Sequence, residues 1–285
     1  MRIWDWRLAI LLAAAVAGFV PITGAIALDD GLTYRVPPSQ VHLQRILKDE
    51  KAITQTAADA AILKQASDAP DLLTRLAVEF AAKNADLRYR QAVRAQQADL
   101  LEIARDPDMA ADIVALAPEP LSSQIRDTID AWYAIWRLAG IDEYDKVRIH
   151  PRPLGSALPQ DQLLAIYQDA GARYQVDWAV LASINFIESD FGRVNGPSTA
   201  GAVGPMQFMP ATWEQYGDGD INDPHDAIWA AARYLFLHGS RTDIGRALFA
   251  YNHDWDYVTA IVDYAAVMRR DPSWAARYYY WTTSG

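Results

Sequence analysis

The sequence predicts an all-α protein in which a helical stalk or accessory region precedes a second helical domain. Residues 40–105 are rich in Ala, Leu, Gln, Lys, Arg and Glu, and their apolar residues recur at helical intervals. The second half carries helix start and stop signals in quick succession, such as Asp223-Pro224 before an apolar run and Gly239 after it. No alternating pattern typical of strands stands out there.

Composition limits the classes of protein to which the chain can belong. It has 285 residues, 51% of them hydrophobic and 11% aromatic, which is enough for one or two domains with a real core. A net charge of -10 argues against nucleic acid as a partner, because such a protein needs a basic surface. The absence of cysteine excludes disulfides, a thiolate nucleophile and a lipid-modified cysteine.

Residues 1–28 have the pattern of a signal peptide or a membrane anchor. Arg2 and Arg7 precede an uncharged run that is long enough to cross a bilayer. Either a small-x-small site at residues 25–27 is cleaved, or the whole segment stays as an anchor with its arginines in the cytoplasm. Both alternatives export the remainder. Residues 29–39 are polar, contain a proline pair and are expected to form a linker.

Residues 40–153 are assigned to the helical stalk or accessory region. One or two long helices are expected over residues 40–105, with a break near residues 68–70. No heptad pattern is sustained, so a helical hairpin or a small bundle is favoured over a parallel coiled coil.

Two further helices are expected over residues 109–117 and 121–138, between prolines. Trp132 and Trp136 lie four positions apart on one face of the second helix. This spacing is more typical of core residues than of a ligand platform.

A domain boundary is expected within residues 140–157, so that residues 154–285 form the second domain. There, Pro159 is positioned to open one helix and Asp177 to cap the next. The remaining helices are expected over residues 224–238, 244–251 and 256–268. The chain closes with the aromatic segment SWAARYYYW, which either packs as a last helix or forms a sugar-stacking wall.

The stretch 184–213 is the strongest candidate for a functional site. Glu188 follows a strongly apolar helix, and a glycine-rich segment comes after it. An apolar environment raises a carboxyl pKa by disfavouring the charged form, and cleavage of a glycosidic bond requires a carboxylic acid that is protonated near neutral pH. Glu188 is therefore predicted to be a catalytic acid.

Four ordered blocks carry a resemblance to a known family. They are ESDFGR at 188–193, STAGAVGPMQFMPATW at 198–213, DPHDAI at 223–228 and AYNH at 250–253. With these blocks, residues 154–268 resemble the lytic transglycosylases of bacterial cell walls, which have a goose-type-lysozyme-like (SLT) catalytic domain. The blocks look most like the membrane-bound B-type branch. The resemblance does not cover the helical N-terminal half.

The resemblance implies that Glu188 is the single acid/base of peptidoglycan cleavage. It would protonate the glycosidic oxygen between N-acetylmuramic acid and N-acetylglucosamine, then deprotonate the muramyl 6-hydroxyl so that a 1,6-anhydro product forms. The residues that match the family's substrate-binding positions are Ser198, Met206, Gln207, Tyr251 and Asn252.

Two alternatives to this function stay open. Asp190, Asp218, Asp220 or Asp223 could supply the second carboxylate of a hydrolytic muramidase, which sequence cannot place in space. From a different class, the chain could be a non-catalytic envelope scaffold that only binds glycan, although binding alone requires no buried acid.

No cofactor or metal is expected. Asp218, Asp220 and Asn222 alternate as calcium ligands do, but the twelfth position of such a loop is Trp229, so a turn that caps the next helix is favoured. The histidines have no zinc-site spacing.

The expected partners are peptidoglycan strands, the membrane through the N-terminal segment, and an envelope protein through the helical region. The expected location is the extracytoplasmic face of the membrane or, after secretion, the cell wall.

Overall fold

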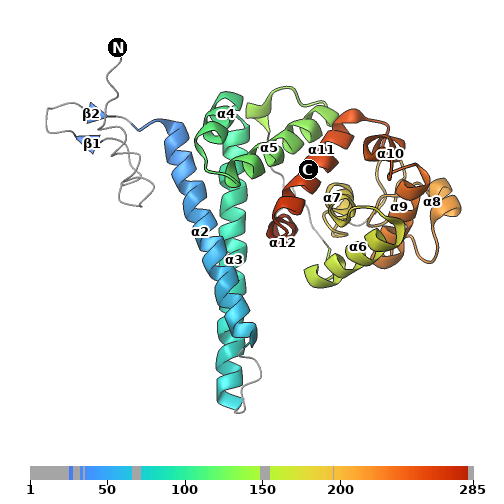
Figure 1. Ribbon diagram of the computed structural model, residues 1–285, viewed down its shortest axis with the longest axis horizontal. Coiled ribbons are helices and arrows are strands. Elements are labelled where there is room, and N and C mark those ends of the chain that lie inside the picture. Colours follow the sequence, from blue (N-terminus) through green and yellow to red (C-terminus); the bar gives the residue numbers. More distant parts are fainter. Residues whose placement is uncertain are drawn as a thin grey trace. The chain divides into compact units, whose positions relative to one another are not determined.

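The computed structural model describes residues 26–27, 33–34, 36–65, 72–147, 155–194 and 196–281. The chain divides into two compact units, Met1–Ser122 and Ser123–Gly285. Both are helical in the described residues apart from one pair of two-residue strands, so the predicted all-α class is confirmed (Figure 1). The expected signal peptide or anchor at residues 1–28 lies outside the described residues, except for residues 26–27.

The first unit is built on a pair of long helices. Strands β1 (Ile26–Ala27) and β2 (Thr33–Tyr34) form an antiparallel pair, with Ile26 opposite Tyr34. Helices α2 (Pro38–Gln65) and α3 (Leu72–Ala104) lie side by side as a hairpin, and α4 (Pro107–Leu116) contacts both (Figure 1). The predicted helical hairpin is thus observed, and the break expected near residues 68–70 lies outside the described residues.

The hairpin is held by an apolar seam and by ion pairs at its margins. Ile46, Val93 and Ile103 are fully buried. Arg45 lies 3.7 Å from Asp99 and 3.5 Å from Glu102. Burial of these apolar side chains is the main stabilising contribution, because partly exposed ion pairs add little. Among the described residues, no helix combines the length and the apolar composition that a membrane crossing requires.

The second unit surrounds one buried helix. Its elements are α5 (Leu121–Leu138), which starts at the end of the first unit, the 3-10 turn η2 (Tyr144–Lys146), α6 (Gln160–Tyr174), α7 (Trp178–Ser189), α8 (Pro210–Tyr216), α9 (Pro224–Leu237), α10 (Ile244–Tyr251), α11 (Trp255–Arg270) and α12 (Ser273–Tyr280). Helix α7 is in contact with α6, α9, α11 and α12 (Figure 1). Because neighbours cover it on several sides, its sequence is apolar almost all round.

The caps expected from the sequence position these helices. The Asp177 carboxylate accepts a hydrogen bond from the Ala179 N–H at 2.9 Å, and Asp223 accepts from the N–H groups of His225 and Asp226. After α9, Gly239 has a φ of +85°, the left-handed conformation that ends a helix. Helix α8 was not expected; it begins at Pro210 within the stretch assigned to a glycine-rich segment.

Helix α5 packs within the second unit, although the sequence analysis had grouped it with the accessory region. The Thr128 hydroxyl lies 2.8 Å from the Tyr278 hydroxyl, and the Trp132 ring lies 5.3 Å from that of Trp281. Trp132 and Trp136 are buried, as predicted for core residues. The division at residue 153 thus differs from the observed units because the apolar face of α5 is covered by α12.

The aromatic C-terminal segment forms the packed helix α12. Trp274, Tyr278 and Trp281 are buried, and Tyr278 stacks on Phe186 of α7 with ring centroids 5.5 Å apart. Of the two alternatives for this segment, the packed helix is the one observed. The guanidinium carbon of Arg193 lies over the Tyr279 ring, 4.1 Å from the ring centroid. This cation–π contact connects α12 to the segment that follows α7.

Candidate active site

Glu188 lies in the last turn of α7 and is half-buried. Burial raises the pKa of its carboxyl from 4.5 to about 7, and the hydrogen bond from Tyr257 opposes this rise. The Tyr257 hydroxyl donates that bond to Oε1 over 2.7 Å. A carboxyl group in this state is protonated in a large share of molecules at neutral pH, which is what a general acid requires.

Two tyrosines flank the acid. Tyr257, in the first turn of α11, is 1% exposed, and its ring is parallel to that of Tyr251 at the end of α10, with centroids 6.5 Å apart. Burial, followed by the nearby Glu188, raises the pKa of both hydroxyls well above 10.0. Both phenols are therefore protonated at physiological pH and act as hydrogen-bond donors.

Tyr251 connects the end of α10 to the loop of residues 203–208. Its hydroxyl donates to the carbonyl oxygen of Met206 over 2.7 Å. Met206 itself is fully buried, and Asn252 is the half-buried C-cap of α10. The structure thus joins Glu188, Tyr251 and Met206, which are far apart in the sequence, through Tyr257 and one backbone carbonyl.

The loop of residues 203–208 is a tight turn closed by backbone hydrogen bonds between Val203 and Phe208. Gln207 has a φ of +48°, and its side-chain amide donates to the Gly204 carbonyl over 3.0 Å. Gly204 has a φ of +79°, and a Cβ atom there would lie 2.0 Å from the carbonyl oxygen of Ile221. Only glycine fits this position, because it alone combines the left-handed backbone with the close approach.

A buried polar network connects the loop of residues 203–208 to α6 and α7. The Tyr167 hydroxyl donates to Asn185 Oδ1 over 2.6 Å, and Asn185 Nδ2 donates to the Pro205 carbonyl over 2.8 Å. The hydroxyl of Ser189 donates to the same carbonyl. Asn185 and Ser189 stand one turn apart on α7, either side of Glu188. They link α6, α7 and the loop, and so orient the segment that carries Met206 and Gln207.

Ser198 occupies an exposed turn. Its hydroxyl oxygen accepts hydrogen bonds from the N–H groups of Ala200 and Ala202, at 3.2 and 3.0 Å. Within the described residues these are its side-chain contacts, and none reaches Glu188. Of the predicted substrate-binding residues, Tyr251 lies near Glu188 and donates a hydrogen bond to Met206. Gln207 and Asn252 follow Met206 and Tyr251 in the chain, and the hydrogen bonds of the Ser198 side chain lie within its own turn.

The other acidic residues considered as a second carboxylate have local roles. Asp190 is buried and pairs with Arg193, whose Nη1 lies 3.4 Å from its Oδ1. Asp220 Oδ1 accepts from the backbone N–H of Asn222 at 2.8 Å, and Asp223 caps α9. Among the described residues, no acidic side chain contributes to the raised pKa of Glu188.

The loop considered for calcium is a hydrogen-bonded turn that leads into α9. Asp220 Oδ1 accepts from both the backbone and the side-chain N–H of Asn222, and the Asp220 N–H donates to Asp226. Within the described residues, the acidic and histidine side chains that come close enough together for a metal ion are His42, Asp99 and Glu102, and separately Asp223, His225 and Asp226. Asp218 belongs to neither group.

Tyr257, Asn185 and Ser189 were not identified from the sequence. Tyr257 gives no local signal, because a tyrosine in the first turn of a helix is ordinary. Asn185 and Ser189 gave a weak one: they are polar residues four positions apart in a helix that is otherwise apolar, and buried polar groups require partners.

Comparisons with known proteins assign the part of the chain that contains this site to a domain family. Residues 165–256 match the transglycosylase SLT domain family, a range that includes Glu188, the loop and Tyr251. The chain is also similar to membrane-bound lytic murein transglycosylase B of Escherichia coli (strain K12), with 51% identity over 49 residues. That match covers 15% of this chain and 14% of the relative. No solved structure matches the chain significantly.

Proposed function

We propose that this chain, which carries a transglycosylase SLT domain at residues 165–256, is a lytic transglycosylase of peptidoglycan. The domain implies this activity at the level of the family. The finer proposal is cleavage of the β-1,4 bond between N-acetylmuramic acid and N-acetylglucosamine, with formation of 1,6-anhydro-N-acetylmuramic acid. The observation that carries it is the raised pKa of Glu188 together with its hydrogen bond from Tyr257.

In the first step, protonated Glu188 donates its proton to the glycosidic oxygen as the bond from that oxygen to the muramyl C1 breaks. A pKa of about 7 suits this role, because a catalytic acid works best when its pKa is near the working pH. The hydrogen bond from Tyr257 engages Oε1, and in this mechanism Oε2 is the oxygen that carries the donated proton. General acid catalysis by a positioned side chain of this kind typically raises the reaction rate by about 10²–10⁴-fold.

In the second step, the Glu188 carboxylate takes the proton of the muramyl 6-hydroxyl, and O6 forms a bond to C1. This closes the anhydro ring and returns Glu188 to its protonated state. The hydroxyl of Tyr257 stabilises the carboxylate between the steps, because hydrogen bonds to a charged acceptor are stronger than those to a neutral one. One carboxylate serves as both acid and base.

The substrate-binding residues are proposed to be Ser198, Met206, Gln207, Tyr251 and Asn252. Gln207 and Asn252 are half-buried amides, which offer both donors and acceptors to the acetamido groups of the glycan. Tyr251 fixes the loop through Met206, and Met206 contributes packing. Ser198, in its exposed turn, is proposed to contact the reacting sugar through its hydroxyl.

Glu188→Gln should abolish glycan cleavage, with glycan binding and the fold retained. The matched control is Glu214→Gln on α8, an exposed acid that should leave cleavage intact. Mass spectrometry of digested peptidoglycan separates the candidate functions. Anhydro ends support the transglycosylase, reducing muramyl ends support a muramidase, and uncut strands that remain bound support a scaffold.

A hydrolase requires a second carboxylate or a base that activates water. Asp190 is paired with Arg193 and is therefore a poor candidate for this role, which favours cyclisation over hydrolysis. Near-normal cleavage by Glu188→Gln would refute the mechanism as a whole. Reducing ends from the unmutated chain would refute only the cyclisation step.

We also propose export of the chain, with residues 1–28 as signal peptide or anchor, residues 29–39 as linker and the helices before the SLT domain as an accessory region. Mass spectrometry of the N-terminal peptide, after separation of membrane and soluble fractions, tests this. A first residue near 28 in the soluble envelope fraction indicates cleavage. An intact N-terminus in the membrane fraction indicates an anchor, and a cytoplasmic chain contradicts both.

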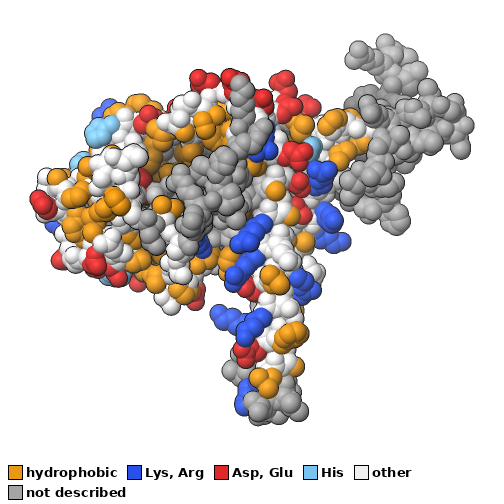
Figure 2. Space-filling model, turned by 180° about the vertical axis from the view of Figure 1, so that it is seen from behind, with side chains coloured by type: hydrophobic (Ala, Val, Ile, Leu, Met, Phe, Trp, Pro, Cys, Tyr) orange, Lys and Arg blue, Asp and Glu red, His pale blue; other side chains and the backbone are white. Residues whose placement is uncertain are grey.

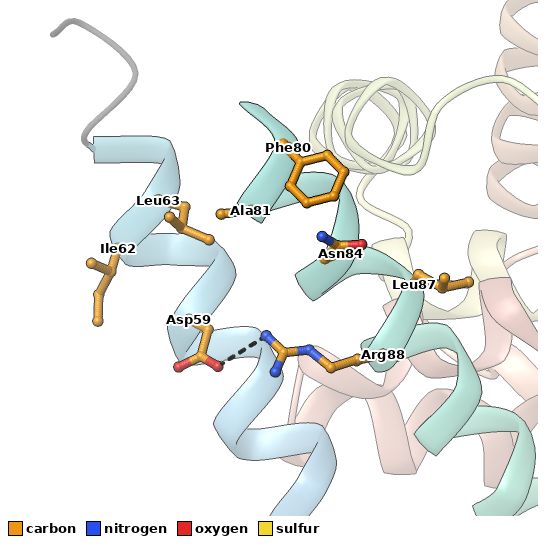
Figure 3. Close-up of a pocket in the computed structure, with 8 residues that line it drawn as sticks. All are labelled: Asp59, Ile62, Leu63, Phe80, Ala81, Asn84, Leu87 and Arg88. Carbon is orange, nitrogen blue, oxygen red and sulfur yellow. Dashed lines mark ion pairs between the residues drawn. The ribbon is translucent and has the colours of Figure 1, made fainter. Parts of the chain in front are cut away.

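The hairpin of α2 and α3 is the proposed surface for an envelope protein partner. A pocket of about 680 Å³ lies between these helices, lined by Ile62, Leu63, Phe80, Leu87 and an ion pair of Asp59 with Arg88 at 3.5 Å (Figure 3). Phe80 is 71% exposed and Ile62 65%. Hydrophobic side chains and basic ones alternate along the hairpin (Figure 2). Large exposed apolar side chains that line a hollow are typical of interaction sites.

A photo-reactive phenylalanine analogue at position 80 should form an adduct with the partner in cells. The same analogue at the exposed position Gln91 of α3 is the control. Equal adduct formation at the two positions would contradict a specific partner surface.

A further inference from the structure

A pocket of the second unit lies at the junction of α10 and α11, and neither Glu188 nor Tyr257 lines it. It measures about 440 Å³ and is lined by Phe249, His253, Asp254, Trp255, Asp256 and Thr259. Trp255 is 59% exposed, and one face of its indole stacks on Phe249, with centroids 4.8 Å apart and planes at 28°. The indole is therefore largely open to solvent at a pocket that has room for a ligand.

The pocket lies on a different side of α11 from the acid. Trp255 and Tyr257 are two positions apart on this helix, and an α-helix turns about 100° per residue. The two side chains therefore point in directions about 200° apart. Tyr257 faces Glu188 and is buried, whereas Trp255 faces solvent. A ligand on Trp255 would thus be held by the catalytic unit without occupying the position of the reacting bond.

The polar groups at the rim of the pocket are fixed in place. Asp256 Oδ1 accepts two hydrogen bonds from Arg137, at 2.7 Å from Nη2 and 3.0 Å from Nε. Asp254 Oδ1 caps α11 by accepting from the Asp256 N–H at 2.7 Å. The Thr259 hydroxyl donates to the Trp255 carbonyl over 3.0 Å and keeps its oxygen as an acceptor. Each carboxylate has a second oxygen, Oδ2, that can also accept hydrogen bonds, and both residues line the pocket.

This charge balance decides which ligand fits. Arg137 compensates the charge of Asp256, so the rim does not have the two uncompensated carboxylates that would favour a cation over the indole face. What remains is a flat aromatic face bordered by hydrogen-bond acceptors. A neutral pyranose ring matches it, because its C–H groups pack on the aromatic face while its hydroxyl and amide groups donate to the acceptors.

We infer that Trp255 is the centre of a second glycan-binding site that holds a sugar of the peptidoglycan strand away from the cleaved bond. This inference rests on the proposed function for the identity of the polysaccharide. Because Trp255 shares α11 with Tyr257, the hydrogen-bond partner of Glu188, a strand bound at Trp255 stays near the catalytic acid between cleavage events. Binding at two sites raises the effective concentration of strand at the acid.

Binding to purified, insoluble peptidoglycan tests the inference, with the Glu188→Gln chain as the parent so that the strand is not cut. Adding Trp255→Ala should weaken binding about tenfold, the effect expected for loss of one aromatic stacking contact in a built site. The matched control is Phe236→Ala, which removes an exposed aromatic ring of α9 outside the pocket. It should bind like the parent.

Trp255→Tyr keeps a ring and a polar edge, so it should recover most of the affinity even if Trp255→Ala unfolds. Equal binding by Trp255→Ala and its parent, or an equal loss with Phe236→Ala, would overturn the inference. The proposed function fails separately: if the unmutated chain yields no cut glycan but binding still depends on Trp255, the second site stands and the cleavage does not.

Discussion

The hydroxyl of Tyr257 lies 2.7 Å from Oε1 of Glu188 and donates a hydrogen bond to it. Burial raises the pKa of Glu188, and this bond lowers it; the result is about 7. The same tyrosine therefore orients the carboxyl group and limits how far burial shifts its ionisation. A carboxyl group without this donor would be a weaker acid and would form a less stable carboxylate.

Replacement of Tyr257 by Phe should move the basic limb of the pH–rate profile upward. The proposed mechanism requires protonated Glu188, so kcat/KM is expected to fall as pH rises through about 7. Loss of the donor raises the pKa of Glu188, which shifts this fall to higher pH, while the maximal rate drops. Profiles of kcat/KM measured from pH 5 to about 9 check the shift. The control is Tyr251→Phe. The hydroxyl that it removes donates to the Met206 carbonyl and not to Glu188, so the pH at which kcat/KM falls should not change. A limb that moves downward with Tyr257→Phe would contradict this assignment.

Asp263→Asn should stabilise the second unit at alkaline pH. Burial, followed by the charges of Asp127 and Asp130, raises the pKa of Asp263 from 3.8 to about 7. A raised folded-state pKa gives stability that is present below about pH 4 and is lost as pH rises through about 7. Asparagine avoids the buried charge, so the unfolding temperature should rise by several degrees at pH 8 and hardly change at pH 4. Thermal unfolding at both pH values checks this. Asp169→Asn, at an exposed site on α6, should show no such difference.

Asn185→Leu should destabilise the second unit by about 2–4 kcal/mol, because it leaves the buried Tyr167 hydroxyl without its acceptor and removes one of the two donors to the Pro205 carbonyl. Ser183→Ala is the matched control on α7. Ser183 is also fully buried, but its hydroxyl donates to the Ala179 carbonyl of the same helix. Its replacement should therefore lower the free energy of unfolding by only about 1 kcal/mol. Denaturant unfolding measures both. Equal losses would show that the network does not support the loop.

Gly204→Ala should disrupt the loop of residues 203–208 and raise KM. The new Cβ would lie 2.0 Å from the Ile221 carbonyl, in addition to the cost of a φ of +79°. Gly201→Ala separates these effects, because Gly201 has a φ of +89° but nothing within 4 Å of its Cβ position. Its loss of stability should be about 1 kcal/mol, from backbone strain alone. If denaturant unfolding shows the same loss of stability for both variants, the close approach to Ile221 does not explain the effect of Gly204→Ala.

The helix ends could be predicted from the sequence because their signals are local. Asp177 and Asp223 cap the helices assigned to them, and α10 has the predicted bounds of residues 244–251. The burial of Trp132 followed from a spacing of four residues. Each of these inferences depends on neighbours within one or two turns of a helix.

The contacts that organise the candidate site depend on distant residues, and for this reason they could not be predicted. Tyr257 is 69 positions from Glu188, and Asn185 is 20 from Pro205. The packing of α5 on α12 likewise joins segments about 150 positions apart, as in the contact of Thr128 with Tyr278. Glu188 could be predicted as the candidate acid because its apolar helix and its sequence blocks are local features.

The cluster of tryptophans between α5 and α12 also has a spectroscopic consequence. The Trp132 ring lies 6.2 Å from Trp136 and 5.3 Å from Trp281, and Trp281 lies 6.4 Å from Trp274. Indoles this close couple their electronic transitions, so they should give an intense near-ultraviolet circular dichroism band that depends on fixed tertiary packing. Separation of α12 from α5 would remove the band while the helical signal in the far ultraviolet persists. The second unit therefore contains its own optical reporter of the docking of these two helices.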